Sequence, residues 1–160
     1  MTPQTPYTAD LANREPLGAM HAVGKRLHEL LDGWSPADFE RTYAPGKWTA
    51  RQILMHLAQT EVALGYRARM ALTTPGYAAQ SFDQDAWMAK ESALGGEEAL
   101  DALLAIMAMN RALFASLSAD DRAMTLTHPE YGSLTVDWIV HQMAGHQIHH
   151  LKQLEVIAKP

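Results

Sequence analysis

Apolar residues recur at the spacing of an α-helix in four long segments of this sequence. The segments span residues 13–32, 49–72 and 95–117, and the last one begins near residue 135 and runs almost to the carboxyl end. In each segment, apolar side chains three or four positions apart would line one face of a helix. No segment shows the alternation of apolar and polar residues that is typical of a strand. The pattern therefore predicts an all-α protein, a four-helix bundle with a longer crossover between the second and third helices.

Capping signals support the starts of two of these helices. Thr49 and Gln52 have the spacing of a capping box at the start of the second helix. Asn13 is the expected cap of the first helix. Pro16 is tolerated in the first turn of that helix, where a backbone N–H has no intrahelical partner. Residues 81–94 indicate a further short helix inside the crossover.

Length, composition and charge indicate one domain and exclude several kinds of partner. The chain of 160 residues is long enough for one buried core and too short for two ordinary domains, so residues 1–160 are expected to form a single domain. The net charge is −5 and no basic cluster exists, so no nucleic-acid partner is expected. No stretch approaches the roughly 20 apolar residues that span a membrane. Residues 1–16 form a polar lead-in without a secretory signal, and the protein is expected to be cytoplasmic.

The sequence contains no cysteine and eight histidines. The absence of cysteine excludes disulfides, thiolate ligands and a cysteine nucleophile that belongs to the protein. A metal site in this chain must therefore be built from imidazole, carboxylate and water, and any thiol must arrive with a ligand.

The last helix carries two histidines on its otherwise apolar face. His146 and His150 are four positions apart, about 40° around the helix, so their imidazoles can point at one place. The face that contains them continues through these residues: Ile139, Met143, Gln153 and Ile157. His149 is the competing partner of His146, but Gln142, Gly145 and Lys152 on its side look solvated, and this favours His150.

The second helix supplies a third candidate, His56. It lies between Ile53 and Thr60 on a face with apolar neighbours. Spacing alone leaves open whether the two helices meet at that depth.

Three stretches together resemble the DinB/YfiT-like family of metal-binding helical bundles. They are GKWTARQILMHLAQTE, FDQDAW and YGSLTVDWIVHQMAGHQIHHLKQL, at residues 46–61, 82–87 and 131–154. By this resemblance, the metal ligands are His56, His146 and His150. Many family members carry an acidic residue three positions after the first histidine, where this chain has Gln59. If that carboxylate takes part in catalysis, the activity of this chain differs or is lost.

Two other polar residues are candidates for a supporting role. Glu61 would either orient a ligating imidazole or lie on the edge of the bundle. Gln153, one turn after His150, would either contact bound water or substrate or close a polar patch. The remaining histidines and three of the tryptophans are interpreted as surface, loop or packing residues: His21, His28, His128, His141, Trp48, Trp87 and Trp138.

Three neutral imidazoles leave a divalent ion with open positions, as in catalytic sites. Zinc is expected from the ligand type, and nickel, iron or manganese also accept imidazole. The resemblance implies a homodimer and a transferase that activates a low-molecular-weight thiol for attack on an electrophilic small-molecule substrate. The alternatives are a metal-dependent hydrolase, a thiol-dependent isomerase and a non-catalytic metal-binding protein of a stress response.

Overall fold

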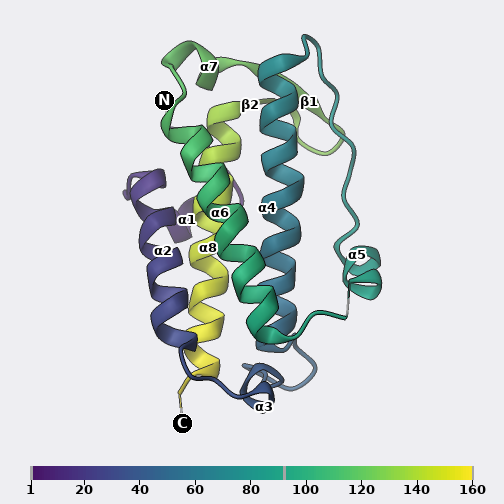
Figure 1. Ribbon diagram of the computed structural model, residues 1–160. Helices are drawn as coiled ribbons and strands as arrows, with labels where there is room; N and C mark the ends of the chain where they lie inside the picture. Colours follow the sequence, from purple (N-terminus) through teal and green to yellow (C-terminus); the bar gives the residue numbers. More distant parts are fainter. Residues whose placement is uncertain (1, 92, 160) are drawn as a thin grey trace.

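Four long helices form a bundle in the computed structural model, which describes residues 2–91 and 93–159. In this part of the chain the long helices are α2 (Pro16–Leu31), α4 (Ala50–Thr73), α6 (Gly96–Ala115) and α8 (Val136–Ile157). Helix α4 packs against α6 and α8, and α2 packs against the same two helices from the opposite side (Figure 1). The prediction of a helical bundle is therefore confirmed.

Short helices occupy the connections between the long ones. They are α1 (Thr8–Leu11), α3 (Pro36–Phe39), α5 (Gln84–Lys90) and α7 (Ala119–Ala123). Helix α5 is the short helix predicted within residues 81–94, and it stands beside α4 in the crossover (Figure 1). None of the helices in the described ranges is both long and apolar enough to cross a bilayer.

A small β-hairpin precedes α8, where the sequence shows no strand-like alternation. Strands β1 (Thr125–His128) and β2 (Gly132–Thr135) pair antiparallel. Leu126 and Leu134 lie opposite each other and are buried, whereas the alternate side chains of β1 are exposed. Four residues per strand are too few for this alternation to stand out in a sequence.

The helix starts follow the local sequence, with one correction. The capping box of α4 is present, because Thr49 Oγ1 accepts from the Gln52 N–H and Gln52 Oε1 accepts from the Thr49 N–H. Helix α2, however, is capped by Glu15 and not by Asn13. A residue before proline is disfavoured in the helical region, so Pro16 holds Glu15 extended and the helix begins after it.

Residues 2–12 do not form a loose polar lead-in, because they pack against α8 through α1. The contact requires Gly145, in the middle of α8: a Cβ atom there would lie 2.6 Å from the backbone oxygen of Tyr7. Trp138 strengthens the contact by donating its indole N–H to the carbonyl of Gln4. This segment therefore covers a face of α8 that looks solvated in the sequence.

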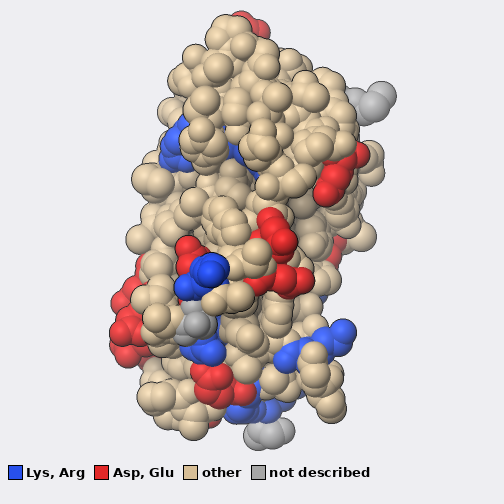
Figure 2. Space-filling view, turned by 90° about the vertical axis from the view of Figure 1, so that its right-hand side faces the viewer, with Lys and Arg blue, Asp and Glu red and all other residues tan. Residues whose placement is uncertain are grey.

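Charged side chains are unevenly distributed on the side of the molecule that carries α5. Figure 2 shows this face as mostly uncharged at its upper end, with charged groups of both signs toward the middle and lower part. The Lys and Arg side chains on this face are separated from one another. Binding of a phosphate backbone would require them to form a continuous basic patch.

A pair of glycine substitutions tests the docking of the first residues on α8. Gly145→Ala should lower the free energy of unfolding by about 1–3 kcal/mol, because the added methyl group overpacks the contact with Tyr7. The matched control is Gly24→Ala in α2, where a Cβ would meet Met107 at an ordinary 3.7 Å. That change should raise stability by ~0.5–1 kcal/mol through helix propensity. Urea unfolding of the metal-free proteins measures both, and equal stability of the two variants would contradict the contact.

Candidate metal centre

Helices α4 and α8 bring together the three histidines identified in the sequence. The Nε2 atoms of His56 and His146 lie 3.0 Å apart, and those of His146 and His150 also lie 3.0 Å apart. One nitrogen from each of the three rings lies within 4.8 Å of the other two. The packing of α4 on α8 thus answers the question that spacing left open.

Burial of the cluster follows from its position on the inner faces of the two helices. His56, His146 and His150 are all less than a tenth exposed. The ring centres of Trp48 and His56 lie 4.8 Å apart, and those of Tyr7 and His146 lie 4.9 Å apart. Trp48, interpreted as a packing residue, therefore also forms one wall of the site.

The three imidazoles are neutral at pH 7. Burial lowers the pKa of His56 to about 3 and that of His150 to about 4, and it holds the pKa of His146 well below its usual value. The proximity of His150 lowers the pKa of both His56 and His146 further. Neutral imidazole is the form that binds metals, so the ligand lone pairs are available across the physiological range.

Gln153 sets the tautomer of His150. Its side-chain oxygen lies 2.7 Å from His150 Nδ1. An amide oxygen only accepts hydrogen bonds, so Nδ1 carries the proton and Nε2 keeps its lone pair toward the other two rings. Hydrogen bonding of the far ring nitrogen is the usual way in which proteins orient a metal-binding histidine. Gln153 thus contacts a histidine of the cluster directly.

The donor set fits a divalent cation. Three Nε2 atoms converge, and the Nε2 of His150 is unprotonated because its proton is on Nδ1. Lone pairs that face one another repel, and a cation between them would remove this repulsion. Nitrogens bound at about 2.0–2.1 Å to a tetrahedral ion are about 3.3 Å apart, close to the 3.0 Å observed here. Three imidazoles also leave at least one coordination position free, as in catalytic zinc sites.

A polar cavity of about 240 Å³ adjoins the cluster. It lies between α4, α8, the hairpin, the crossover and the first residues, and His56 and His146 form part of its wall. Its other lining residues are Tyr7, Thr60, Leu64, Arg67, Ser81, Phe82, Gln84, His128, Glu130, Tyr131 and Gln142. The histidine nitrogens thus have space beside them for a small molecule.

Glu61 lies in a separate buried network. Its carboxylate accepts hydrogen bonds from Asn110 Nδ2 at 2.8 Å and from Gln147 Nε2. Within the described residues it makes no hydrogen bond to the three histidines, and at 2% exposed it does not lie on the edge of the bundle. Burial raises its pKa. Its contacts link α4 to α6 and α8, and they do not orient an imidazole of the cluster.

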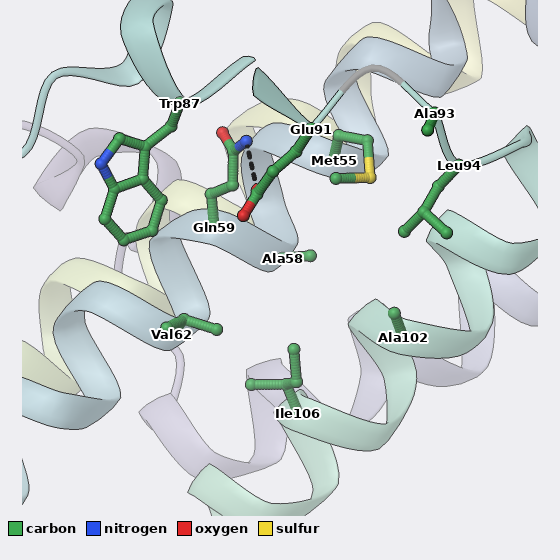
Figure 3. Close-up of a pocket in the computed structure, with 10 residues that line it drawn as sticks. All are labelled: Met55, Ala58, Gln59, Val62, Trp87, Glu91, Ala93, Leu94, Ala102 and Ile106. Carbon is green, nitrogen blue, oxygen red and sulfur yellow. Dashed lines mark hydrogen bonds between the residues drawn. The ribbon is translucent and has the colours of Figure 1, made fainter. Parts of the chain in front are cut away.

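Gln59 faces a different pocket from the one beside the histidines. Its Nε2 donates to Glu91 Oε2 at 2.8 Å, and both residues border a mostly apolar pocket of about 330 Å³ between α4, α5 and α6 (Figure 3). Figure 3 also shows Trp87 over this pocket. Gln59 therefore holds Glu91 against α4.

His149 lies next to the cluster but makes other contacts. Its Nδ1 lies 3.2 Å from an oxygen of Asp10, and the second oxygen of Asp10 accepts from Lys152. The expectation that this side of α8 is solvated is wrong for Gly145, which is buried where α1 covers the helix, and holds for Lys152, which is exposed. His150 is still the residue that joins His56 and His146, as the spacing argument favoured.

Two residues of the cavity escaped the sequence analysis. His128, interpreted as an ordinary loop residue, is buried in β1 and lines the cavity. Arg67 lies on the same stripe of α4 as His56, through Thr60 and Leu64 at spacings of four, four and three. That spacing was a usable signal for Arg67, whereas nothing local marks His128.

Alanine variants test the proposed ligands. His56→Ala, His146→Ala and His150→Ala should each greatly reduce the metal content of the purified protein, because each removes one of three converging nitrogens. His149→Ala is the matched control and should keep most of the metal. Elemental analysis of the four variants measures this, and normal metal in the His150 variant with loss in the His149 variant would reverse the assignment.

Comparisons with known proteins agree with this architecture. Two proteins of Oceanobacillus iheyensis, both named putative metal-dependent hydrolases, are similar in sequence. One is 26% identical over 132 residues, 82% of this chain and 76% of the relative. The other is 28% identical over 121 residues, 75% of this chain and 70% of the relative.

Solved structures share the fold. YfiT from Bacillus subtilis, described as a probable metal-dependent hydrolase with an unusual four-helix bundle topology, superposes with a TM-score of 0.80 at 20% identity. The match covers 89% of this chain and 83% of YfiT. A mycothiol-dependent maleylpyruvate isomerase superposes with a TM-score of 0.73 at 17% identity, over 94% of this chain but 63% of the isomerase. The family description of the DinB superfamily matches residues 19–154, most of the chain, and this protein therefore belongs to the DinB superfamily.

Proposed function

We propose that this protein is a metal-dependent transferase that activates a low-molecular-weight thiol for attack on an electrophile. The observation that carries the proposal is a cluster of three buried, neutral imidazoles beside a cavity of about 240 Å³. The names of its relatives support the metal dependence, and the isomerase with the same fold is thiol-dependent by name.

The carboxylates near the cavity favour thiol chemistry over hydrolysis. A base beside the metal assists the attack of water on an ester or amide, whereas a thiol, with its own pKa of about 8.5, needs less help to lose its proton. Of the described residues that line the cavity, Glu130 is the carboxylate, and it is exposed on the hairpin turn. Glu61, the base that a hydrolase could otherwise use, is occupied by Asn110 and Gln147.

The residues of the site have separable tasks in this reaction. His56, His146 and His150 would hold the ion through Nε2, with Gln153 fixing the ring of His150. A divalent ion, when bound, favours the thiolate form of a thiol at neutral pH. Trp48 and Tyr7 shield the histidines from bulk water, and the cavity orients the electrophile. The sulfur then bonds to the electrophilic carbon. A haloarene loses its halide with the bonding electron pair, and in an epoxide the C–O bond breaks and the ring oxygen takes up a proton.

Hydrolysis is the second candidate, because the relatives from Oceanobacillus iheyensis and YfiT are named as hydrolases. It predicts turnover of esters or amides without added thiol. An isomerase would need thiol but form no net conjugate, and a non-catalytic metal-binding protein would show neither reaction. Product analysis with and without thiol separates these four cases.

The transferase proposal predicts a metal-dependent conjugation rate. Metal-loaded protein should accelerate the addition of a small thiol to a haloarene or an epoxide, and chelation should abolish the effect until metal is restored. The enhancement over the uncatalysed rate should grow as pH falls below the thiol's own pKa of about 8.5, because free thiolate then becomes scarce. Conjugate formation measured across pH gives this profile.

The control for this experiment is the metal-free protein at the same concentration. A panel that includes bacillithiol, mycothiol and glutathione in which loaded protein is no faster than metal-free protein would exclude the transferase. The metal site would stand in that case, and hydrolysis would become the leading function.

We also propose that two copies of the chain pair through α4 and α6. Val62 and Tyr66, one turn apart on α4, are 45% and 55% exposed, and Met109 on the neighbouring α6 is 57% exposed. Apolar groups gathered on one face favour association with a second copy. Light scattering should give a dimer mass, and Tyr66→Glu should shift it toward the monomer. A monomer mass for the unaltered protein across micromolar concentrations would contradict the pairing.

A further inference from the structure

Arg67 lies where the cavity beside the histidines meets two others. It lines that cavity, a second of about 390 Å³ between α4 and the crossover, and a small one under the hairpin. Arg67 is nevertheless buried, with 8% of the residue exposed. A guanidinium in this position is removed from bulk water and still has space for a ligand beside it.

No carboxylate within the described residues lies within ion-pair distance of Arg67, and Glu130 acts on its charge only from farther away. Its guanidinium donates a hydrogen bond to the backbone carbonyl of Gln80. The more exposed Arg26 and Arg122 pair with Glu155 and Asp137, respectively. A guanidinium has five N–H donors and stays charged in proteins, even though burial lowers the pKa of Arg67. Burying such a charge with only the more distant Glu130 to balance it is unfavourable, so an anion from outside the chain that bonds the free N–H groups directly would stabilise it.

His128 supplies a second donor on the same wall of the cavity. Its Nδ1 accepts a hydrogen bond from the backbone N–H of Glu130 at 3.2 Å. Burial and the nearby Arg67 lower its pKa, so the ring is neutral and its single proton is on Nε2. Gln142, which lines the same cavity, has a buried side-chain oxygen without a hydrogen-bond partner within the described chain. The cavity thus offers two donors for an oxyanion and one free acceptor for an N–H or O–H.

The position of Arg67 limits what kind of ligand would reach both ends of the cavity. Arg67 follows His56 by 11 positions, a rise of about 16 Å along a helix. Both side chains lean toward the amino end, and only the greater length of the arginine shortens the gap, so on the order of 10–15 Å separates the two groups. An anion held by Arg67 would therefore be several bonds away from the reacting atom.

We propose that Arg67, assisted by His128, binds an oxyanion of the substrate at the end of the cavity away from the histidines. The substrate class is a small molecule with a carboxylate or phosphate at one end and its thiol or electrophilic carbon at the other. This assignment rests on the proposed function for the identity of the reacting atom, but the binding of the anion does not depend on turnover.

The first experiment measures anion binding without any reaction. Succinate and inorganic phosphate are titrated into metal-loaded protein without thiol, and the melting temperature is recorded, with neutral succinamide as the control ligand. At least one of the two anions should raise the melting temperature, and the comparison between them tells carboxylate from phosphate. Arg67→Gln should abolish the shift, and Arg67→Lys, which keeps the charge but loses the planar fork, should retain part of it.

The matched control variant is Arg69→Gln on the same helix. Arg69 donates to Asn110 and to the carbonyl of Gly65 and lines none of the three cavities, so its loss removes one charge without touching the site. Circular dichroism establishes that each variant is folded. The proposal is overturned if neither anion shifts the unaltered protein, or if Arg67→Gln shifts as much as Arg69→Gln.

A second readout separates failure of this inference from failure of the proposed function. With 4-chloro-3-nitrobenzoate and its methyl ester as electrophiles and mercaptoethanol as thiol, Arg67→Gln should lower kcat/KM for the acid roughly 10- to 100-fold, the range expected for a charged hydrogen bond. The ester should be unaffected. Equal losses for acid and ester would overturn the role of Arg67 in binding this electrophile. Absence of conjugation with retained anion binding would overturn the transferase alone.

Discussion

The site depends on the close packing of α4 against α8, which buries three imidazoles against one another. Desolvation of rings in contact keeps them neutral, and neutrality makes their nitrogens metal ligands and not a repelling cluster of charges. The rest of the bundle serves to hold this contact. Helix α6 packs along α4 from the far side, α2 supports α8, and buried hydrogen bonds from Asn110 and Gln147 to Glu61 tie three helices together beneath the site.

Short segments outside the four long helices complete the wall of the cavity beside the histidines. The hairpin lies near the carboxyl end of α4, the crossover passes beside it, and α1 covers α8, so that none of the four long helices alone encloses the space (Figure 1). Connecting segments tolerate changes more readily than a packed core. The shape of the cavity can therefore vary while the three histidines, which lie on α4 and α8, stay in place.

The features that a sequence analysis could predict are those with local signals. Helical spacing located the four long helices, the Thr49 box located the start of α4, and spacing on α8 chose His150 over His149. The family resemblance was needed to join His56 to them. The missed features depend on contacts between distant residues. Nothing near Gly145 indicates that Tyr7 will cover it, and nothing near His128 indicates that it will line the cavity.

The covering of α8 by the first residues has a consequence for how the protein is made. Asp10 and His149 meet although they are 139 positions apart. During synthesis the segment around Tyr7 leaves the ribosome long before its partner helix exists, and His56 must likewise wait for His146 and His150. The cavity can form only after α8 has emerged, so for most of its translation the nascent chain carries His56 without His146 and His150.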